Sequence, residues 1–214
     1  MALTLHWSPR SPYVRKAMVA LHEKGLMDQV SIIRTAADPL IPHEGLMQLN
    51  PLSKIPTLER EGQSPLWDSR VIMEWADLTG TSGPQLFPAD PEQRLQVLTL
   101  EAVGNGLLDI ALPWLVEIRM RPEAARYQPQ IDAYRRKSIA VFDWLEANIT
   151  SISTSGFNAG QLAIGVALKY FDFRFEAEGW RKNRPLLTAW FDDSFSQRPS
   201  VLQTEFRDDP RPLA

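Results

Sequence analysis

The chain has 214 residues, of which 44% are hydrophobic and 23% charged, and its formal net charge is −3. That length can hold one large or two small domains, and the weak net charge gives no indication of a polyanionic partner such as nucleic acid. No Cys occurs, which excludes disulfide bonds, Cys-ligated metals and any mechanism that needs a protein thiol. The three His residues show no ligand spacing, so no metal site is expected.

The first eighty residues alternate between strand and helix patterns. Leu3–Trp7 alternates like a strand, and Ser11 followed by Pro12 is typical of a helix start, with Gly25 at the helix end. Further along, the pattern predicts a strand at 30–33, a short helix at 42–49, a hairpin with strands at 57–59 and 65–67, and a helix at 69–78. The order βαβαββα predicts a mixed sheet with one parallel crossover and a terminal hairpin.

A Gly- and Pro-rich linker at 81–90 separates this first domain, residues 1–80, from a helical domain at 91–214. Apolar residues at helical spacing predict helices at 92–117, 130–149, 158–178 and 185–197. We expect the first of these to be interrupted near Gly104–Gly106 and at Pro113. The chain therefore combines an α/β domain with an all-α domain. The chain's start does not read as a signal peptide, and we expect a soluble, cytoplasmic protein.

Two short motifs of the first domain are suited to binding a small peptide. Pro56 lacks an N–H, and a cis Ile55–Pro56 bond would let the Ile55 N–H and C=O face outward, where an extended peptide can dock by strand addition. Asp68 and Ser69 then begin a helix whose side chains and N–H groups can hold one end of that peptide. The alternative is a strand broken by Pro and a capped helix without a ligand.

Ser11 is the candidate catalytic residue. As an N-cap it lies near the positive end of a helix, where an anion is favoured. If a thiol-bearing ligand lay against Ile55, Ser11 would donate a hydrogen bond to its thiolate and lower the thiol pKa. The alternative is that Ser11 is only a cap, which stabilises the helix by about 1 kcal/mol.

Three segments, residues 8–16, 50–58 and 68–72, resemble the cytosolic glutathione S-transferase family in order and spacing, and most of all its bacterial members with an N-terminal catalytic serine. Residues 105–109 and 157–165 extend the resemblance to the helical half. It implies a thioredoxin-like N-terminal domain, a helical C-terminal domain that forms the second-substrate site, and glutathione as co-substrate without a metal. By position, Ser11 matches the residue that hydrogen-bonds the glutathione sulfur.

The same resemblance assigns the binding motifs. Ile55 matches the residue whose backbone pairs with the cysteinyl part of glutathione, ahead of cis-Pro56. Asp68 and Ser69 match the acidic–Ser pair that binds the γ-glutamyl end; the usual acid is Glu. Residues Trp7, Arg10, Trp114 and Arg119 are candidates to line the second-substrate pocket.

The helical half departs from the family's pattern twice. Asn158 and Gln161 stand where members usually have Ser or Thr and Asp, and we expect Asn158 to cap the helix and Gln161 to return a reciprocal capping-box bond. Asn105 stands where relatives commonly have Asp, and the sequence assigns no consequence to it.

The resemblance implies a homodimeric detoxification enzyme that activates glutathione for attack on a small hydrophobic electrophile. The family's cysteine-dependent reactions are excluded, because they need a protein thiol. Peroxide reduction, ether cleavage and isomerisation need none and remain open as alternative reactions. The alternatives are a non-catalytic glutathione-transferase-like binding or scaffold protein and a specialised glutathione-dependent catabolic enzyme.

Overall fold

The computed structural model describes residues 2–210, which form two compact units. The first unit contains the described residues up to Phe87 together with those from Pro199 onward, and the second contains Pro88–Arg198. The last described residues therefore belong to the first unit, although they follow the helical half in the sequence.

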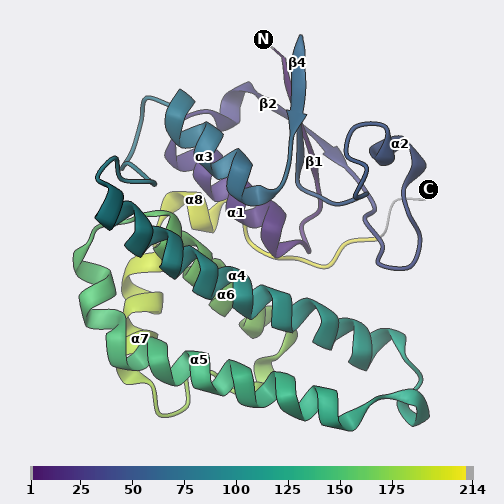
Figure 1. Cartoon of the computed structure of the whole chain (residues 1–214), viewed down its shortest axis with the longest axis vertical. Helices are drawn as coiled ribbons and strands as arrows, with labels where there is room; N and C mark the ends of the chain where they lie inside the picture. Colours follow the sequence, from purple (N-terminus) through teal and green to yellow (C-terminus); the bar gives the residue numbers. More distant parts are fainter. Residues whose placement is uncertain (1, 211–214) are drawn as a thin grey trace. The chain divides into compact units, whose positions relative to one another are not determined.

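The first unit is a four-stranded mixed sheet with helices (Figure 1). Its elements are β1 (Leu3–Trp7), α1 (Pro12–Glu23), β2 (Val30–Arg34), α2 (Glu44–Met47), β3 (Thr57–Arg60), β4 (Gln63–Leu66), α3 (Ser69–Thr79) and α8 (Pro199–Leu202). The strand order is β2-β1-β3-β4, in which β1 is parallel to β2 and antiparallel to β3, and β3 and β4 are antiparallel. The predicted fold class, a thioredoxin-like domain followed by a helical domain, is confirmed.

The core of this unit follows from the sequence pattern. Leu3 and Leu5 of β1 are buried at alternate positions, as expected of a strand whose one face is covered. α1 begins at the N-cap Ser11, with Pro12 at its first position, and buries an apolar stripe against α3. Gly25, just beyond α1, has a φ of +66°, a conformation that glycine adopts without steric cost.

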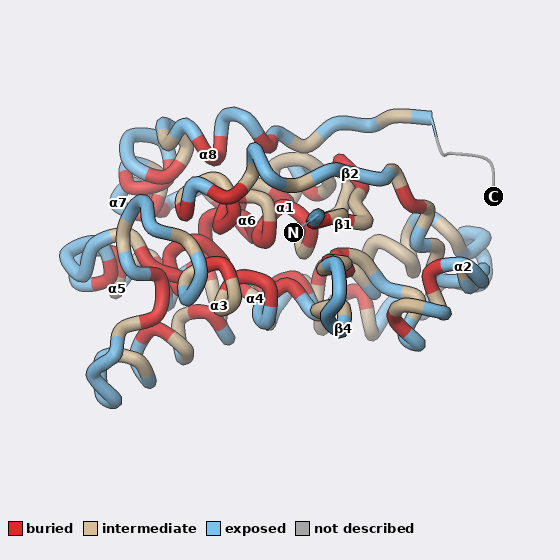
Figure 2. The backbone as a smooth tube through the Cα atoms, turned by 90° about the horizontal axis from the view of Figure 1, so that it is seen from above, coloured by how far each residue is buried: buried red, intermediate tan, exposed pale blue. Residues whose placement is uncertain are grey.

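The second unit consists of helices around the buried helix α6. Its elements are α4 (Pro91–Met120), α5 (Gln128–Thr154), α6 (Ala159–Arg174), α7 (Pro185–Ala189) and a π-helical stretch, Trp190–Phe195. Every residue from Ala159 to Leu168 is buried, so the tube of α6 is red along that length (Figure 2). α4 makes the most extensive contact with α6, and α5 packs against α4 and α7.

Two predictions about this unit are wrong. α4 is continuous through Gly104 and Pro113, because packing against α6 outweighs the weak helix propensity of these residues. A Cβ on Gly104 would lie 2.4 Å from the backbone carbon of Ala163, so the glycine allows the two helices to approach closely. The helix expected at 185–197 ends as α-helix at Ala189 and continues as π-helix.

α4 is, among the described helices, the one that is long and apolar enough to cross a membrane by length and composition. Several of its apolar side chains are buried within the helical unit, where α4 contacts α6 and α5. Core packing of this unit therefore accounts for much of the apolar character of the helix.

Candidate functional site

Three predicted site segments meet the sheet at the same end. Ser11 lies just beyond the end of β1, and Ile55 just before the start of β3; the antiparallel pairing of His6 with Thr57 places these ends together. Asp68 follows the end of β4, which pairs with the start of β3. The topology thus brings Ser11, Ile55 and Asp68 to the same end of the sheet, beyond the ends of its strands.

Ser11 is the N-cap of α1. Its hydroxyl oxygen accepts a hydrogen bond from the Val14 N–H at 3.2 Å, and its side chain is only partly buried. Within residues 2–210 the hydroxyl donates no hydrogen bond, so its proton is available to a ligand. The helix start adds partial positive charge from its exposed N–H groups. This arrangement can hold an anion beside the hydroxyl.

Ile55 precedes Pro56 in a cis peptide bond. Across the described residues, neither the N–H nor the C=O of Ile55 forms a hydrogen bond, so both are open to an extended ligand. The side chain is half-buried, whereas Pro56 is buried.

Asn50 holds the loop before Ile55. Its fully buried amide donates to the Lys54 carbonyl at 3.1 Å and to the Thr57 hydroxyl at 3.0 Å. Its side-chain oxygen accepts from the Leu52 N–H at 3.0 Å. Asn50 therefore determines the conformation of the loop, a role that the sequence did not indicate. The signal that could have found it is an Asn able to bond its own backbone two residues on.

Asp68 and Ser69 begin α3. Asp68 is exposed and is the N-cap, with one carboxylate oxygen accepting the Arg70 N–H at 3.0 Å. Its other oxygen accepts no hydrogen bond from the described part of the chain and is open to a cation. Ser69 is 1% exposed, and its place in the first turn puts it among the unpaired N–H groups of the helix start.

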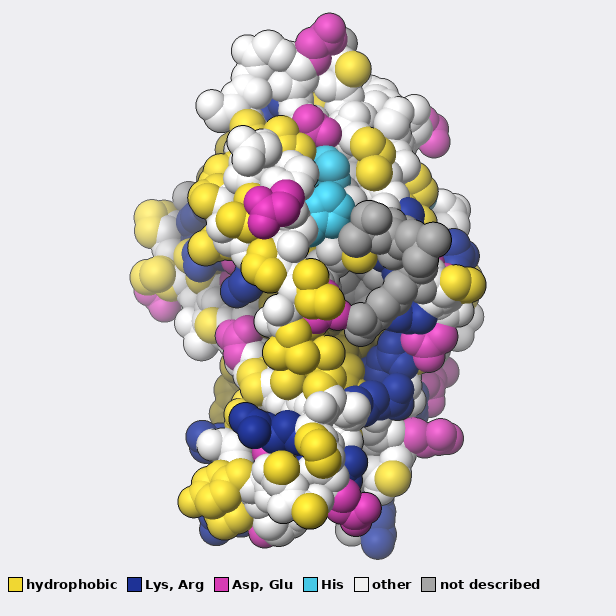
Figure 3. Space-filling model, turned by 90° about the vertical axis from the view of Figure 1, so that its right-hand side faces the viewer, with side chains coloured by type: hydrophobic (Ala, Val, Ile, Leu, Met, Phe, Trp, Pro, Cys, Tyr) yellow, Lys and Arg dark blue, Asp and Glu magenta, His cyan; other side chains and the backbone are white. Residues whose placement is uncertain are grey.

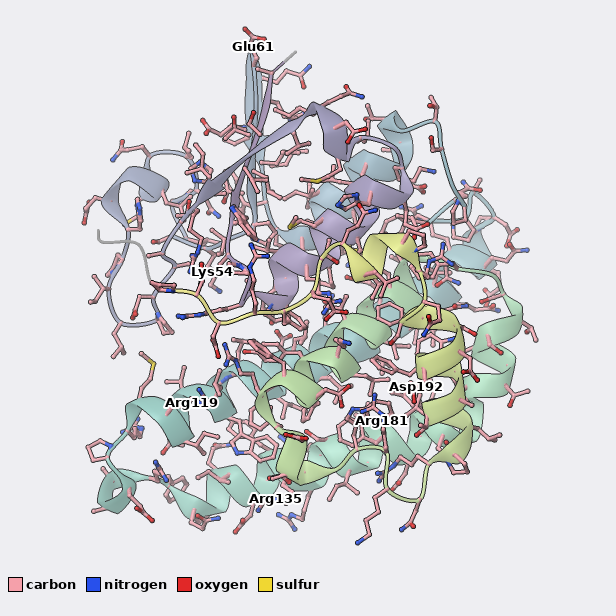
Figure 4. All side chains as sticks on the ribbon, turned by 180° about the vertical axis from the view of Figure 1, so that it is seen from behind. Lys54, Glu61, Arg119, Arg135, Arg181 and Asp192 are labelled. Atoms are coloured by element: carbon pink, nitrogen blue, oxygen red, sulfur yellow. The ribbon has the colours of Figure 1, made fainter. Side chains whose placement is uncertain are left out.

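The four predicted pocket residues are divided between the two units. Trp7 is half-buried at the end of β1, with the Arg207 guanidinium 5.8 Å from its ring centre, and Arg10 forms ion pairs with Asp208 and Asp209. In the helical unit, Trp114 is 2% exposed, with its ring centre 4.6 Å from that of Phe175. Arg119 is exposed near the end of α4 (Figure 4).

The buried start of α6 confirms part of its prediction. The Asn158 side-chain oxygen accepts the Gly160 and Gln161 N–H groups at 3.0 and 3.1 Å, so Asn158 is the N-cap. The reciprocal bond expected of Gln161 is wrong: its amide instead donates to the carbonyls of Ile152 and Gly156 at 2.8 and 2.6 Å. These carbonyls lie at and beyond the end of α5, where helix carbonyls lack partners. Gln161 thus joins two helices.

Asn105 has a structural partner in α4. Its amide donates to a carboxylate oxygen of Glu101 at 2.5 Å, and Glu101 is 1% exposed. An Asp at this position would place a second carboxylate beside a buried one, which is unfavourable. The neutral amide is therefore suited to this site.

A C-terminal segment, residues 205–210, was not singled out by the sequence, yet it lies against the start of α1. Arg15 is buried at its base, donating to the Val201 carbonyl at 2.9 Å and lying 4.5 Å from the Phe206 ring centre. Burial lowers the pKa of Arg15 to about 10, and the nearby Glu205 carboxylate partly offsets this, so Arg15 stays charged at neutral pH. Figures 1 and 4 show this yellow segment passing the start of α1. No pattern in the sequence links positions so distant.

Within residues 2–210 no group of three or more His, Cys, Asp or Glu side chains is arranged to hold a metal ion.

Comparison with known proteins identifies relatives along nearly the whole chain. Residues 10–79 match the family described as glutathione S-transferase, N-terminal domain. An uncharacterized GST-like protein of Escherichia coli K12, YibF, is 33% identical over 198 residues, which cover 91% of this chain and 94% of that protein.

Solved structures give the same result. A glutathione transferase family member from Pseudomonas fluorescens Pf-5 with bound glutathione has a TM-score of 0.92 and 36% identity, covering 97% of this chain and 100% of that one. A structure described as a family member from the same organism, with bound S-(propanoic acid)-glutathione, has a TM-score of 0.87 and 35% identity, covering 99% and 100%. From the fold, the site and these relatives, the chain belongs to the glutathione S-transferase family.

Proposed function

We propose that the protein is a glutathione transferase in which Ser11 stabilises the glutathione thiolate for attack on a small hydrophobic electrophile. The observation that carries the proposal is the Ser11 hydroxyl at the positive start of α1, which donates no hydrogen bond within residues 2–210. A hydrogen bond to the thiolate favours the charged form and lowers the thiol pKa. Attack by the thiolate then needs no protein nucleophile.

The remaining contacts in this proposal follow the glutathione chain. The open N–H and C=O of Ile55, ahead of Pro56, pair with the cysteinyl backbone. The open oxygen of Asp68 pairs with the γ-glutamyl ammonium, while Ser69 and the start of α3 hold its carboxylate. No metal takes part in this scheme.

In the first unit, Trp7 and Arg10 are proposed as contacts of the second substrate. In the helical unit, Arg119 and Trp114, which is buried against Phe175, are the residues proposed for this role. The bound S-(propanoic acid)-glutathione of the Pseudomonas relative supports a reaction in which the sulfur gains a carbon group.

We propose that the protein is a cytoplasmic homodimer with a role in detoxification. Exposed apolar side chains support an interface: on α3, Val71 is 42% and Leu78 82% exposed. Others, Leu40, Ile41 and Leu52, lie in the loops before and after α2. Figure 3 shows yellow hydrophobic side chains on the face that it presents. Sedimentation at dilute concentration tests the dimer: a monomer at all concentrations would contradict it.

Conjugation assays with aryl halides and epoxides test the catalytic proposal. Ser11→Ala should lower kcat/KM by about tenfold to a hundredfold, the value of a hydrogen bond to a charged group. Ser64→Ala, a change on the exposed strand β4, is the matched control and should behave like the parent. Equal rates for Ser11→Ala and the parent, or inertness towards every substrate, would refute catalysis by Ser11. Calorimetry with glutathione then separates the scaffold alternative, for which no binding at millimolar ligand is expected.

A further inference from the structure

Two guanidinium groups of the first unit converge on one carboxylate. Arg34 holds Asp209 by a two-pronged contact, Nε to Oδ2 at 2.7 Å and Nη2 to Oδ1 at 2.9 Å. Arg10 lies 3.5 Å from Oδ1 of the same group and 3.1 Å from Asp208 Oδ1, and it also donates to the Asp209 carbonyl. This fork is the geometry by which arginine recognises carboxylates.

The two arginines lie beside the proposed catalytic serine. Arg10 directly precedes Ser11. Arg34 is the last residue of β2 and pairs with Trp7, the last residue of the parallel strand β1. Both arginines therefore lie at the carboxyl ends of the parallel strands β1 and β2, where ligands of α/β folds commonly bind.

The carboxylate that fills this pair is held by a segment with little structure of its own. Residues 205–210 form neither helix nor strand, and Asp208 is 59% exposed at its side chain. The backbone of the segment bonds the rest of the first unit through the Arg207 N–H, which donates to the Pro9 carbonyl at 3.3 Å, and through the Asp209 carbonyl, which accepts from Arg10. The Arg34–Asp209 pair is itself partly open to solvent, with 21% and 25% of the two side chains exposed, and segments with few buried contacts open readily. The base of the segment is held more firmly by buried Arg15.

Asp209 is fully charged at neutral pH, because its hydrogen bonds with Arg34 lower the pKa of its carboxyl below the ordinary value. It therefore presents to Arg10 and Arg34 the same chemical group that an external carboxylate would present. The Asp208 carboxylate also faces this pair, at Arg10.

We propose that Arg10 and Arg34 form an acid-binding subsite next to Ser11, and that Asp209 is an internal ligand which the carboxylate of an acidic electrophile replaces. This inference rests on the proposed function and gives its substrate class: small electrophiles with a carboxylate, such as α,β-unsaturated acids. With acrylate, the glutathione thiolate forms a C–S bond to the terminal carbon. The π electrons of the C=C bond move to the carbon next to the carboxylate, which takes a proton from water. The product is S-(2-carboxyethyl)glutathione.

Calorimetry with that product and its neutral amide, S-(2-carbamoylethyl)glutathione, tests the subsite without requiring turnover. Asp209→Asn removes the competing charge, so the acid should bind about five- to tenfold more tightly, while the amide should change by less than about twofold. Arg34→Gln should weaken the acid relative to the amide by about tenfold. Asp28→Asn removes an equal charge from an exposed position and should leave both affinities at the parent's values.

The outcomes separate the possibilities. Equal responses of acid and amide to Asp209→Asn would overturn the proposal and leave the C-terminal segment a structural element. The same gain for glutathione itself would also overturn it, because the carboxylate concerned would then be one of glutathione's own. Failure of both thioethers to bind would overturn it as well. Failure of the proposed catalytic function is seen separately, as equal turnover by the parent and Ser11→Ala.

Discussion

α1 and α6 both begin at a polar N-cap, but the two caps have different surroundings. Ser11 is partly exposed and, within the described residues, its hydroxyl donates no hydrogen bond. Asn158 is 3% exposed and uses its oxygen for two N–H groups and its amide for Ser155 and Gly156, both at 3.1 Å. A helix cap can serve a ligand only where it keeps a polar group unused. We therefore expect the first cap to act in binding and the second in stability.

The largest effect is expected at Asn50, where one substitution should lower both the stability of the fold and the affinity for glutathione. Asn50→Ala removes three hydrogen bonds that a fully buried side chain makes around the Ile55 loop, and the free energy of unfolding should fall by about 3 kcal/mol. Because the loop presents Ile55, glutathione affinity should fall at least about tenfold. Thermal unfolding and calorimetry measure the two effects. Asn148→Ala, at a half-buried position of α5 where the Asn amide donates to the Trp144 carbonyl, is the matched control.

Asn158→Ala should affect stability alone. It removes the cap of α6 and leaves buried groups without partners, so the free energy of unfolding should fall by about 2 to 3 kcal/mol. Glutathione affinity should remain that of the parent. Asn158→Asp keeps the accepting oxygen but loses both donated bonds, so its free energy of unfolding should lie between those of the parent and Asn158→Ala. An unchanged melting temperature in Asn158→Ala would refute the capping role.

Asp68→Asn should weaken glutathione binding and leave stability unchanged, the opposite of Asn158→Ala. Asn is as good an N-cap as Asp, so the start of α3 and the melting temperature should be preserved. The lost charge should weaken glutathione binding about tenfold, because an ammonium then loses its ionic partner. Calorimetry and thermal unfolding of the same sample check both statements. Equal affinity for glutathione would remove Asp68 from the proposed site.

The smallest effect is expected at Asn105. Asn105→Asp brings a second carboxylate to buried Glu101, and the free energy of unfolding at neutral pH should fall by about 1 to 2 kcal/mol. Urea unfolding at neutral pH measures this loss, and an unchanged free energy of unfolding would contradict the explanation.

The sequence predicted those features that depend on neighbouring residues. The cap at Ser11, the start of α3 at Asp68 and the order of strands follow from local propensities and periodicity. The continuity of α4 at Gly104 was missed, because it depends on the approach of α6 from distant sequence. Gln161 was predicted to bond locally, yet it bonds the end of α5.

The same reason explains what the sequence missed at the candidate site. Arg34 and Asp209 are separated by 175 positions and meet only in the folded chain. The role of Asn50 needs the whole loop to close around it. Long-range polar contacts leave no periodic trace, whereas caps and strands do.

The pKa of the glutathione thiol bound to the protein tests the central claim most directly. It is measured by titrating the ultraviolet absorbance of the thiolate in complexes with the parent and with Ser11→Ala. We predict a pKa about one to two units below the ordinary thiol value of about 8.5 in the parent, and a return towards that value in the variant. The same thiol pKa in both complexes would contradict the role of Ser11.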